Sequence, residues 1–498
     1  MNRLLNRSIA INKFKNELLS KSKKKGRSKR KIKMSQRFSS SEQEEKDDDD
    51  AEHQYSSNPL KSHPDYLEDA SRLIKAKERE VSFRQLVPEI PSTTYATFSL
   101  YNYPAKFIPQ VVAYVLKNYT KTNKRAEDMR RRVFDPFAGY GTVGLVSRIY
   151  GLDYELWDLN PMLSLLHRVA TLKPIKEESS LIHGITKEIQ RSNEHLFMPK
   201  WSKLDYWFPT KALPFLFNVW GAYHSLEESR KEGAGSNSLT QLHLLLLIPL
   251  LKATRMLSYN DGQRQKLSKS AFSKARVDSL LSHDWRRIFF ERVLEFALDL
   301  NRKLLEFESL SPKSVKSKIL SGVDASREDL DENVDLLITS PPYLQAQEYI
   351  RNSKLDLFWL GYTEDQVRDL SSKEIPYGRV ERAPIYSPTY WNYRDGIDEN
   401  DMKEIYDKYF WGVLGALTKL ESKVRSKLCF FVGSANLRGR SVPISHIFRE
   451  HFSSLGWKHE WTLVDTIVAR RLFDYGKNPA TGIRDKRMSK ECLLILRR

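Results

Sequence analysis

Cysteine is nearly absent from this chain of 498 residues, which contains only Cys429 and Cys492. Both lie in apolar, strand-like runs, so the sequence predicts a reducing compartment and excludes a disulfide framework. Two thiols also argue against a thiolate metal site, and we expect no metal. No apolar run reaches 18 residues. The longest, Leu244–Leu251, is too short to span a bilayer, so we expect no membrane partner.

Acidic residues are in the minority, since 63 Asp and Glu face 82 Lys and Arg and leave a net charge of +19. Residues 1–37 hold 14 basic residues against one acid, whereas residues 42–52 hold eight acids against one lysine. We expect residues 1–60 to be a disordered tail, serving as a nuclear address, a DNA-contacting arm or an extension without a role. The tail accounts for +6, so the remaining chain carries +13. That excess fits a nucleic-acid partner or a solvated basic surface.

Residues 133–142, V-F-D-P-F-A-G-Y-G-T, are the most informative stretch. They predict a buried strand that ends at Asp135, a turn containing Gly139 and Gly141, and a helix that begins at Thr142. Glycine allows positive φ and a close approach of a ligand to the main chain. The helix N-terminus offers free N–H groups to a polar ligand. Alone, this spacing fits either a dinucleotide fingerprint or a tight structural turn.

Two further predicted strands end in polar residues. Residues 154–158, Y-E-L-W-D, end in Asp158, an acid that can bind ribose hydroxyls in a doubly wound sheet. Residues 334–338, V-D-L-L-I, lead into Thr339–Tyr343, T-S-P-P-Y. No Lys-Ser or Lys-Thr follows the glycines, so the sequence has no P-loop there. A plain NAD enzyme has no reason to place two prolines and a tyrosine at a strand end.

Together and in this order, D-P-F-A-G-Y-G-T and T-S-P-P-Y resemble the amino-methylating DNA methyltransferases, which use S-adenosylmethionine. The serine of the second motif resembles the N4-cytosine members most, and the N6-adenine members are the alternative. The resemblance covers roughly residues 95–165 and 316–498. It implies an α/β fold of the class I methyltransferase type, with a doubly wound, mostly parallel sheet.

The resemblance also implies a catalytic role for the second motif. The hydroxyl of Ser340 and the carbonyl of Pro341 are natural acceptors for an exocyclic amine. Pro342 stiffens the turn, and Tyr343 can stack on an extruded base. The implied cofactor is S-adenosylmethionine. Most of its expected contacts lie at or after the ends of three predicted strands, and two lie in the segment before a predicted helix. These residues are Tyr103, Lys106, Asp135, Pro136, Phe137, Gly139, Gly141, Thr142, Asp158, Asn160 and Asp324.

Four regions are predicted along the chain. After the tail, residues 66–174 form the first part of the methyltransferase domain, and residues 316–498 form the second part. Residues 175–315 between them read as a helical insertion, which is a candidate target-recognition region. Within it, Leu239–Leu251 predicts a buried helix that is kinked or ended near Pro249.

Basic residues mixed with polar or aromatic side chains mark candidates for DNA contact. They occur in residues 258–276 of the insertion, in residues 362–400, and in a loop between the last two predicted strands. A solvated loop or a lid without base contact would have the same composition. The candidates are Arg264, Lys266, Lys269, Lys274, Arg379, Arg382 and Arg470.

We therefore expect a sequence-specific methyltransferase that modifies cytosine N4 in double-stranded DNA by base flipping, in a restriction–modification system or as an orphan enzyme. C5-cytosine methylation is excluded because neither Cys429 nor Cys492 follows a proline in a nucleophile loop. The alternatives are an N6-adenine or RNA amino-methyltransferase, an NAD-linked oxidoreductase, and a DNA-binding protein with a degenerate methylase fold. We expect a monomer or weak dimer, cytoplasmic in a prokaryote and nuclear in a eukaryote, with a cognate restriction endonuclease as a candidate partner.

Overall fold

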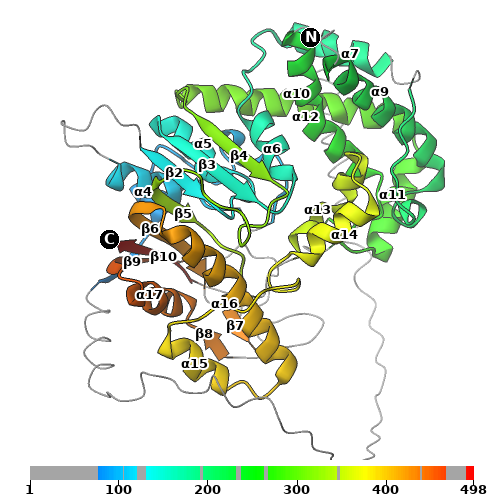
Figure 1. Cartoon of the computed structure of the whole chain (residues 1–498). Helices are drawn as coiled ribbons and strands as arrows, with labels where there is room; N and C mark the ends of the chain where they lie inside the picture. Colours follow the sequence, from blue (N-terminus) through cyan, green and yellow to red (C-terminus); the bar gives the residue numbers. More distant parts are fainter. Residues whose placement is uncertain are drawn as a thin grey trace, which may run out of the picture. The chain divides into compact units, whose positions relative to one another are not determined.

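An eight-stranded sheet lies at the centre of the fold, in the order β1-β9-β10-β6-β5-β2-β3-β4 (Figure 1). Among the described strands, β10 runs antiparallel to both of its neighbours, β6 and β9, and all other neighbours are parallel. The strands span Glu78–Val81 (β1), Arg132–Asp135 (β2), Asp153–Asp158 (β3), Ser317–Ser321 (β4), Val334–Thr339 (β5), Val424–Gly433 (β6), Lys458–Thr466 (β9) and Lys490–Arg497 (β10). A separate antiparallel pair joins β7 (Ala435–Leu437) to β8 (Arg440–Val442).

The computed structural model describes residues 77–104, 106–120, 131–190, 195–231, 237–262, 267–344, 348–433, 435–437, 440–466 and 490–498. They all belong to one compact unit, His63–Arg498. The predicted tail and three of the DNA-contact candidates, Arg264, Lys266 and Arg470, lie outside these residues.

Both faces of the sheet are buried, because side chains alternate along each strand. On β2, Val133 and Phe134 belong to two different hydrophobic clusters, and Leu336 and Leu337 on β5 divide in the same way. One cluster includes α4 (Pro109–Tyr119), α5 (Thr142–Tyr150) and α6 (Met162–Ala170). The other includes α16 (Asn400–Glu421) and α17 (Ile444–Ser454). Helices on both faces of a mostly parallel sheet give a doubly wound fold.

Between α6 and β4 the chain forms a helical insertion, which extends beyond the sheet in Figure 1. Its members are α7 (Glu178–Gln190), α8 (Leu204–Trp207), α9 (Leu213–Lys231), α10 (Asn237–Met256), α11 (Ala271–Leu281) and α12 (Trp285–Ser309). After β5 come α13 (Tyr349–Trp359), α14 (Glu364–Ser372) and α15 (Pro388–Asp395), and short helical turns include α3 (Phe83–Leu86). None of the described helices is long and apolar enough to cross a membrane.

These observations confirm the predicted class I methyltransferase-like fold and its helical insertion. Two local details add to the sequence predictions. The helix predicted to be kinked or ended near Pro249 does not end there: α10 continues to Met256, because the surrounding leucines remain buried and stabilise the helix past the proline. Part of the segment 258–276, for which a solvated loop was one alternative, is helical: α11 begins after Ser270, whose side chain accepts a hydrogen bond from Ser273 N.

Candidate active site

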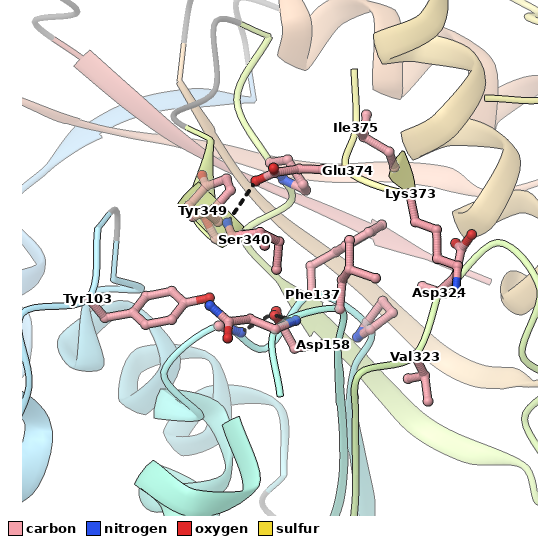
Figure 2. Close-up of a pocket in the computed structure, with 17 residues that line it drawn as sticks. Tyr103, Phe137, Asp158, Val323, Asp324, Ser340, Tyr349, Lys373, Glu374 and Ile375 are labelled. Carbon is pink, nitrogen blue, oxygen red and sulfur yellow. Dashed lines mark hydrogen bonds between the residues drawn. The ribbon is translucent and has the colours of Figure 1, made fainter. Parts of the chain in front are cut away.

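The carboxyl ends of β4, β3, β2 and β5 meet at one edge of the sheet, where open α/β sheets bind ligands. The chain order reverses at β2, which pairs with β3 on one side and with β5 on the other. A cavity opens at this edge (Figure 2). Its lining consists of Tyr103, Pro136, Phe137, Gly139, Asp158, Leu159, Asn160, Val323, Asp324, Ala325, Ser340, Pro342, Tyr349, Ile350, Lys373, Glu374 and Ile375.

The two glycines of the first motif and Gly144, in the helix that follows it, have different structural roles. Gly139 lines the cavity with a φ of 54°, and a Cβ there would lie 3.2 Å from the ring of Tyr103. Gly141 has a φ of 86°, and a Cβ would lie 2.9 Å from His167 Nδ1, on the side of the packed helices. At Gly144 a Cβ would lie 2.7 Å from Tyr154 Cε2. Only the first glycine therefore serves the cavity directly.

Asp158 connects the glycine turn to the end of β3. Its Oδ2 accepts a hydrogen bond from Gly139 N at 2.7 Å, and its Oδ1 accepts one from Asn160 N at 2.7 Å. The backbone carbonyl of Asp158 accepts from Gly322 N and so fixes the loop after β4. Burial raises the pKa of Asp158 to about 6, because the charged form loses solvation. Through its side chain and its backbone carbonyl, Asp158 therefore connects three segments around the cavity.

The second motif follows β5 directly. Ser340 and Pro342 line the cavity, whereas Pro341 is buried and outside the lining. Tyr343 also lies outside the lining, and its hydroxyl donates a 2.6 Å hydrogen bond to Glu491 Oε1 on β10. Burial, with the neighbouring Glu491, raises the pKa of Tyr343 well above its usual value, so the phenol stays neutral. Glu491 was not predicted as a site residue.

A second wall of the cavity comes from α13 and from the loop after α14. Tyr349 stacks against Tyr103, with ring centroids 6.4 Å apart and an interplanar angle of 22°. Glu374 Oε1 accepts a hydrogen bond from Ile350 N at 3.2 Å, in the first turn of α13. Burial raises the pKa of Glu374 to about 7. This wall was not predicted from the sequence, because its residues belong to no motif and meet the strand ends only in the folded chain.

An ion pair between a partly exposed arginine and a buried aspartate connects the second wall to the insertion. Arg255 of α10 binds Asp356 of α13 through two nitrogens, with Nε–Oδ1 at 2.9 Å and Nη2–Oδ2 at 2.7 Å. Arg255 also donates to Asn352 O at 2.7 Å, and Tyr101 donates its hydroxyl hydrogen to Asp356. Charge-assisted, bidentate contacts of this kind are strong and fix orientation. The insertion therefore supports α13 and, through it, the second wall.

Most predicted cofactor residues line the cavity, and the rest support its surroundings. Asp135 is 1% exposed and accepts a hydrogen bond from Phe137 N, and burial raises its pKa to about 7. Lys106 Nζ donates to Ser99 Oγ at 2.8 Å. The predicted residues outside the lining are Lys106, Asp135, Gly141, Thr142, Pro341 and Tyr343. No group of three or more metal-ligating side chains occurs among the residues that the structure describes.

The described DNA-contact candidates differ in whether their charged groups are exposed to solvent or already engaged within the protein. Lys274 is exposed on α11, and Arg379 and Arg382 are exposed between α14 and α15. Lys269 instead donates to Tyr206 O at 3.0 Å and lies over the rings of Tyr206 and Tyr259, 4.5 and 4.4 Å from their centroids. Its charge is therefore already engaged.

The aromatic side chains of residues 362–400 divide into exposed and internal groups. Tyr377, Tyr386 and Trp391 are among the exposed large hydrophobic side chains. Tyr390 is fully buried and donates its hydroxyl hydrogen to Asp407, which also binds Arg394 at 2.8 Å. Composition alone did not separate these groups, because only the packing against α16 decides which rings face solvent.

The sheet order, the antiparallel β10 and the cavity at the strand ends define a class I methyltransferase-like architecture. In sequence, the chain is similar to the type II methyltransferase M.MvaI of Kocuria varians, with 22% identity over 438 residues, 82% of this chain and 92% of that protein. It is also similar to the type II methyltransferase M.BsoBI of Geobacillus stearothermophilus, with 23% identity over 270 residues, 49% of this chain and 50% of that protein. No family model and no solved structure matches the chain.

Proposed function

We propose that this chain is an S-adenosylmethionine-dependent DNA methyltransferase that modifies the N4 amine of cytosine in duplex DNA. The observation that carries the proposal is that Ser340 and Pro342 line the same cavity as Gly139 and Asp158. A methyl donor in that cavity would lie beside the groups expected to orient the amine. The similarity to two type II methyltransferases supports the same reaction class.

The cavity fits the proposed cofactor in its chemistry. Phe137, Val323 and Ala325 provide apolar surface for an adenine ring, and Asp324 lies beside them as an acceptor for its amino group. Asp158 is an acceptor for ribose hydroxyls at the end of β3. The turn at Gly139 leaves room for close approach to the main chain. When bound, S-adenosylmethionine would supply a methyl group carried on a positively charged sulfur.

The protein side chains would activate and orient the amine. Its nitrogen is a poor nucleophile, because its lone pair is delocalised into the ring. Ser340 Oγ and the carbonyl of Pro341 would accept hydrogen bonds from the amine and favour a pyramidal nitrogen. Pro342 limits the freedom of the turn and so fixes the direction of that carbonyl. Positioning of this kind contributes much of the rate in reactions without a covalent intermediate.

Extrusion of the base would use Tyr343 and exposed basic side chains. The ring of Tyr343 would stack on the flipped base, and this stacking offsets roughly 1–3 kcal/mol of the unstacking cost. Glu491 keeps the hydroxyl of that tyrosine in place. Lys274, Arg379 and Arg382 are exposed and can neutralise phosphates. The serine of the motif favours cytosine N4, and adenine N6 is the second candidate because its chemistry needs the same groups.

Two experiments test the proposal. Calorimetry should detect S-adenosylmethionine binding and no NAD binding, and the reverse result would favour an oxidoreductase. Modification-sensitive sequencing of DNA from cells that express the chain should reveal N4-methylcytosine at one recurrent sequence. Finding N6-methyladenine instead would favour the second candidate, methylation of adenine N6. Methylation of RNA without methylation of DNA would contradict the proposed substrate.

A further inference from the structure

Glu374 is a buried carboxylate in the cavity wall that the proposed chemistry does not use. It is 6% exposed and lies in the loop after α14. Figure 2 shows it on the side of the cavity where Ser340 and Tyr349 lie, while Val323 and Asp324 lie on another side, where the adenine is proposed to bind. Its charge influences both Tyr349 and Tyr103. Glu374 is therefore placed near the expected position of the reacting groups.

The side chains that line the cavity carry more negative than positive charge. Three of them are carboxylates, Asp158, Asp324 and Glu374, and one is a lysine, Lys373. The ammonium of that lysine binds Asp369 on α14 at 2.7 Å and does not neutralise the cavity. Both oxygens of Asp158 accept backbone hydrogen bonds. A cavity with this balance favours a ligand with a positive charge on the side of Glu374.

We propose that Glu374 is a binding residue whose carboxylate faces the sulfonium of the methyl donor and favours the charged donor over the uncharged thioether product. This inference rests on the proposed function. The adenosine, the ammonium and the carboxylate are common to S-adenosylmethionine and S-adenosylhomocysteine. Only the charge on sulfur and the transferred methyl distinguish them. A carboxylate near the sulfur therefore stabilises the donor complex selectively, and its attraction is strengthened by the limited access of water.

The competing explanation is that Glu374 only satisfies the N-terminus of α13, where Ile350 N donates to it. The two roles predict different results for Glu374→Gln. The amide keeps the shape and an oxygen acceptor for Ile350 N but removes the charge. A purely structural role would change the affinities for donor and product by the same factor.

The experiment is calorimetric titration of the full chain with S-adenosylmethionine and, separately, with S-adenosylhomocysteine. We expect Glu374→Gln to weaken donor binding about tenfold and product binding less than twofold, as expected for a partly screened charge pair. The matched control is Asp324→Asn, which neutralises a carboxylate on the side of the same cavity where the adenine is proposed to bind. It should weaken both ligands by a similar factor, because both contain the same adenine.

The outcomes separate this inference from the proposed function. Equal losses for both ligands in Glu374→Gln, or no loss for either, would overturn the sulfonium contact while leaving the cofactor assignment intact. If the unmodified protein binds neither ligand, the proposed function itself fails. Thermal unfolding of Glu374→Gln without ligand reports whether the helix contact has been preserved.

Discussion

The two walls of the cavity differ in how the chain builds them. The first wall consists of turns that follow parallel strands, so Gly139, Asp158, Asp324 and Ser340 are placed by backbone pairing within the sheet. The second wall consists of α13 and the loop after α14, which pair with no strand. Its position depends on side-chain contacts, which include the ion pair between Arg255 and Asp356 and the packing of α13 in a hydrophobic cluster.

This difference means that the groups expected to take part in the reaction lie on the first wall, whereas the second wall encloses the cavity. Strand ends fix the groups expected to bind the cofactor and the amine, because a buried sheet edge has little freedom to move. A helix held by an ion pair can be moved by one substitution. Mutations in the first wall should therefore change mainly the turnover rate. Mutations in the second wall should change mainly the stability of the fold and the affinity for ligands.

The largest effect is expected when the support of the second wall is removed. Arg255→Ala leaves Asp356, which is 1% exposed, without its charge partner. We expect a loss of about 3–5 kcal/mol in the free energy of unfolding, measured by urea denaturation. The control is Arg368→Ala, which breaks a fully exposed pair with Asp365 on α14 and should cost less than about 1 kcal/mol. Equal losses in the two variants would mean that the ion pair does not support α13.

In the first wall, Ser340→Ala removes an acceptor for the amine but leaves the cavity and the stacking ring. We expect turnover to fall about a hundredfold, which is about 2.7 kcal/mol in activation free energy. Affinities for S-adenosylmethionine and DNA should stay within about twofold. Ser371→Ala, on α14, removes a hydroxyl outside the cavity lining and serves as the control. A Ser340→Ala enzyme with normal turnover would remove the hydroxyl from the mechanism.

Tyr343 joins the first wall to β10, and its substitutions test the proposed stacking. Tyr343→Ala should abolish most of the fluorescence increase of 2-aminopurine at the target position, because stacking contributes roughly 1–3 kcal/mol. Tyr343→Phe retains the ring but loses the bond to Glu491, worth about 1 kcal/mol, so flipping should persist with a few-fold lower activity. If Tyr343→Ala flips and methylates like the unmodified chain, the motif is structural and the catalytic role of T-S-P-P-Y is wrong.

The same contrast explains what the sequence could predict. Strands β2, β3 and β5 are short apolar runs followed by motif residues, so their ends and their shared edge follow from local patterns. Asp158 and Ser340 were predicted on this basis and line the cavity.

Contacts between distant residues could not be predicted in this way. Glu374 reaches α13 across 24 residues, and Glu491 reaches Tyr343 across 148. Neither glutamate belongs to a periodic pattern or a motif, and a single acid in a loop is most often solvated. Edge strand β1 escaped prediction because its four residues, E-R-E-V, are mostly charged and are ordered by pairing with β9.

The pH dependence of stability offers a further test, at the buried end of β2 behind the first wall. Burial raises the pKa of Asp135 to about 7, so folding favours its protonated form. The resulting stability is fully present below about pH 4 and is lost as the pH rises through about 7. Asp135→Asn should therefore flatten the pH dependence of urea unfolding between these limits, by about 1.4 kcal/mol for each pKa unit of the shift. Asp365→Asn, at an exposed position, is the control and should leave the pH dependence of unfolding unchanged. If the unmodified chain and both variants show a similar pH dependence, Asp135 is not its source.

The smallest expected effect concerns the insertion, where two lysines of one segment differ in availability. Lys274 is exposed on α11, whereas Lys269 is engaged by Tyr206 and Tyr259. If α11 faces DNA, Lys274→Gln should reduce the slope of log affinity against log salt by about one unit, because one phosphate contact is lost. Lys269→Gln should change that slope little. Fluorescence anisotropy over about 50 to 200 mM salt measures both variants. A slope identical to that of the unmodified chain in Lys274→Gln would mean that α11 is solvated and that DNA contacts another surface, with the exposed Arg379 and Arg382 as the next residues to neutralise.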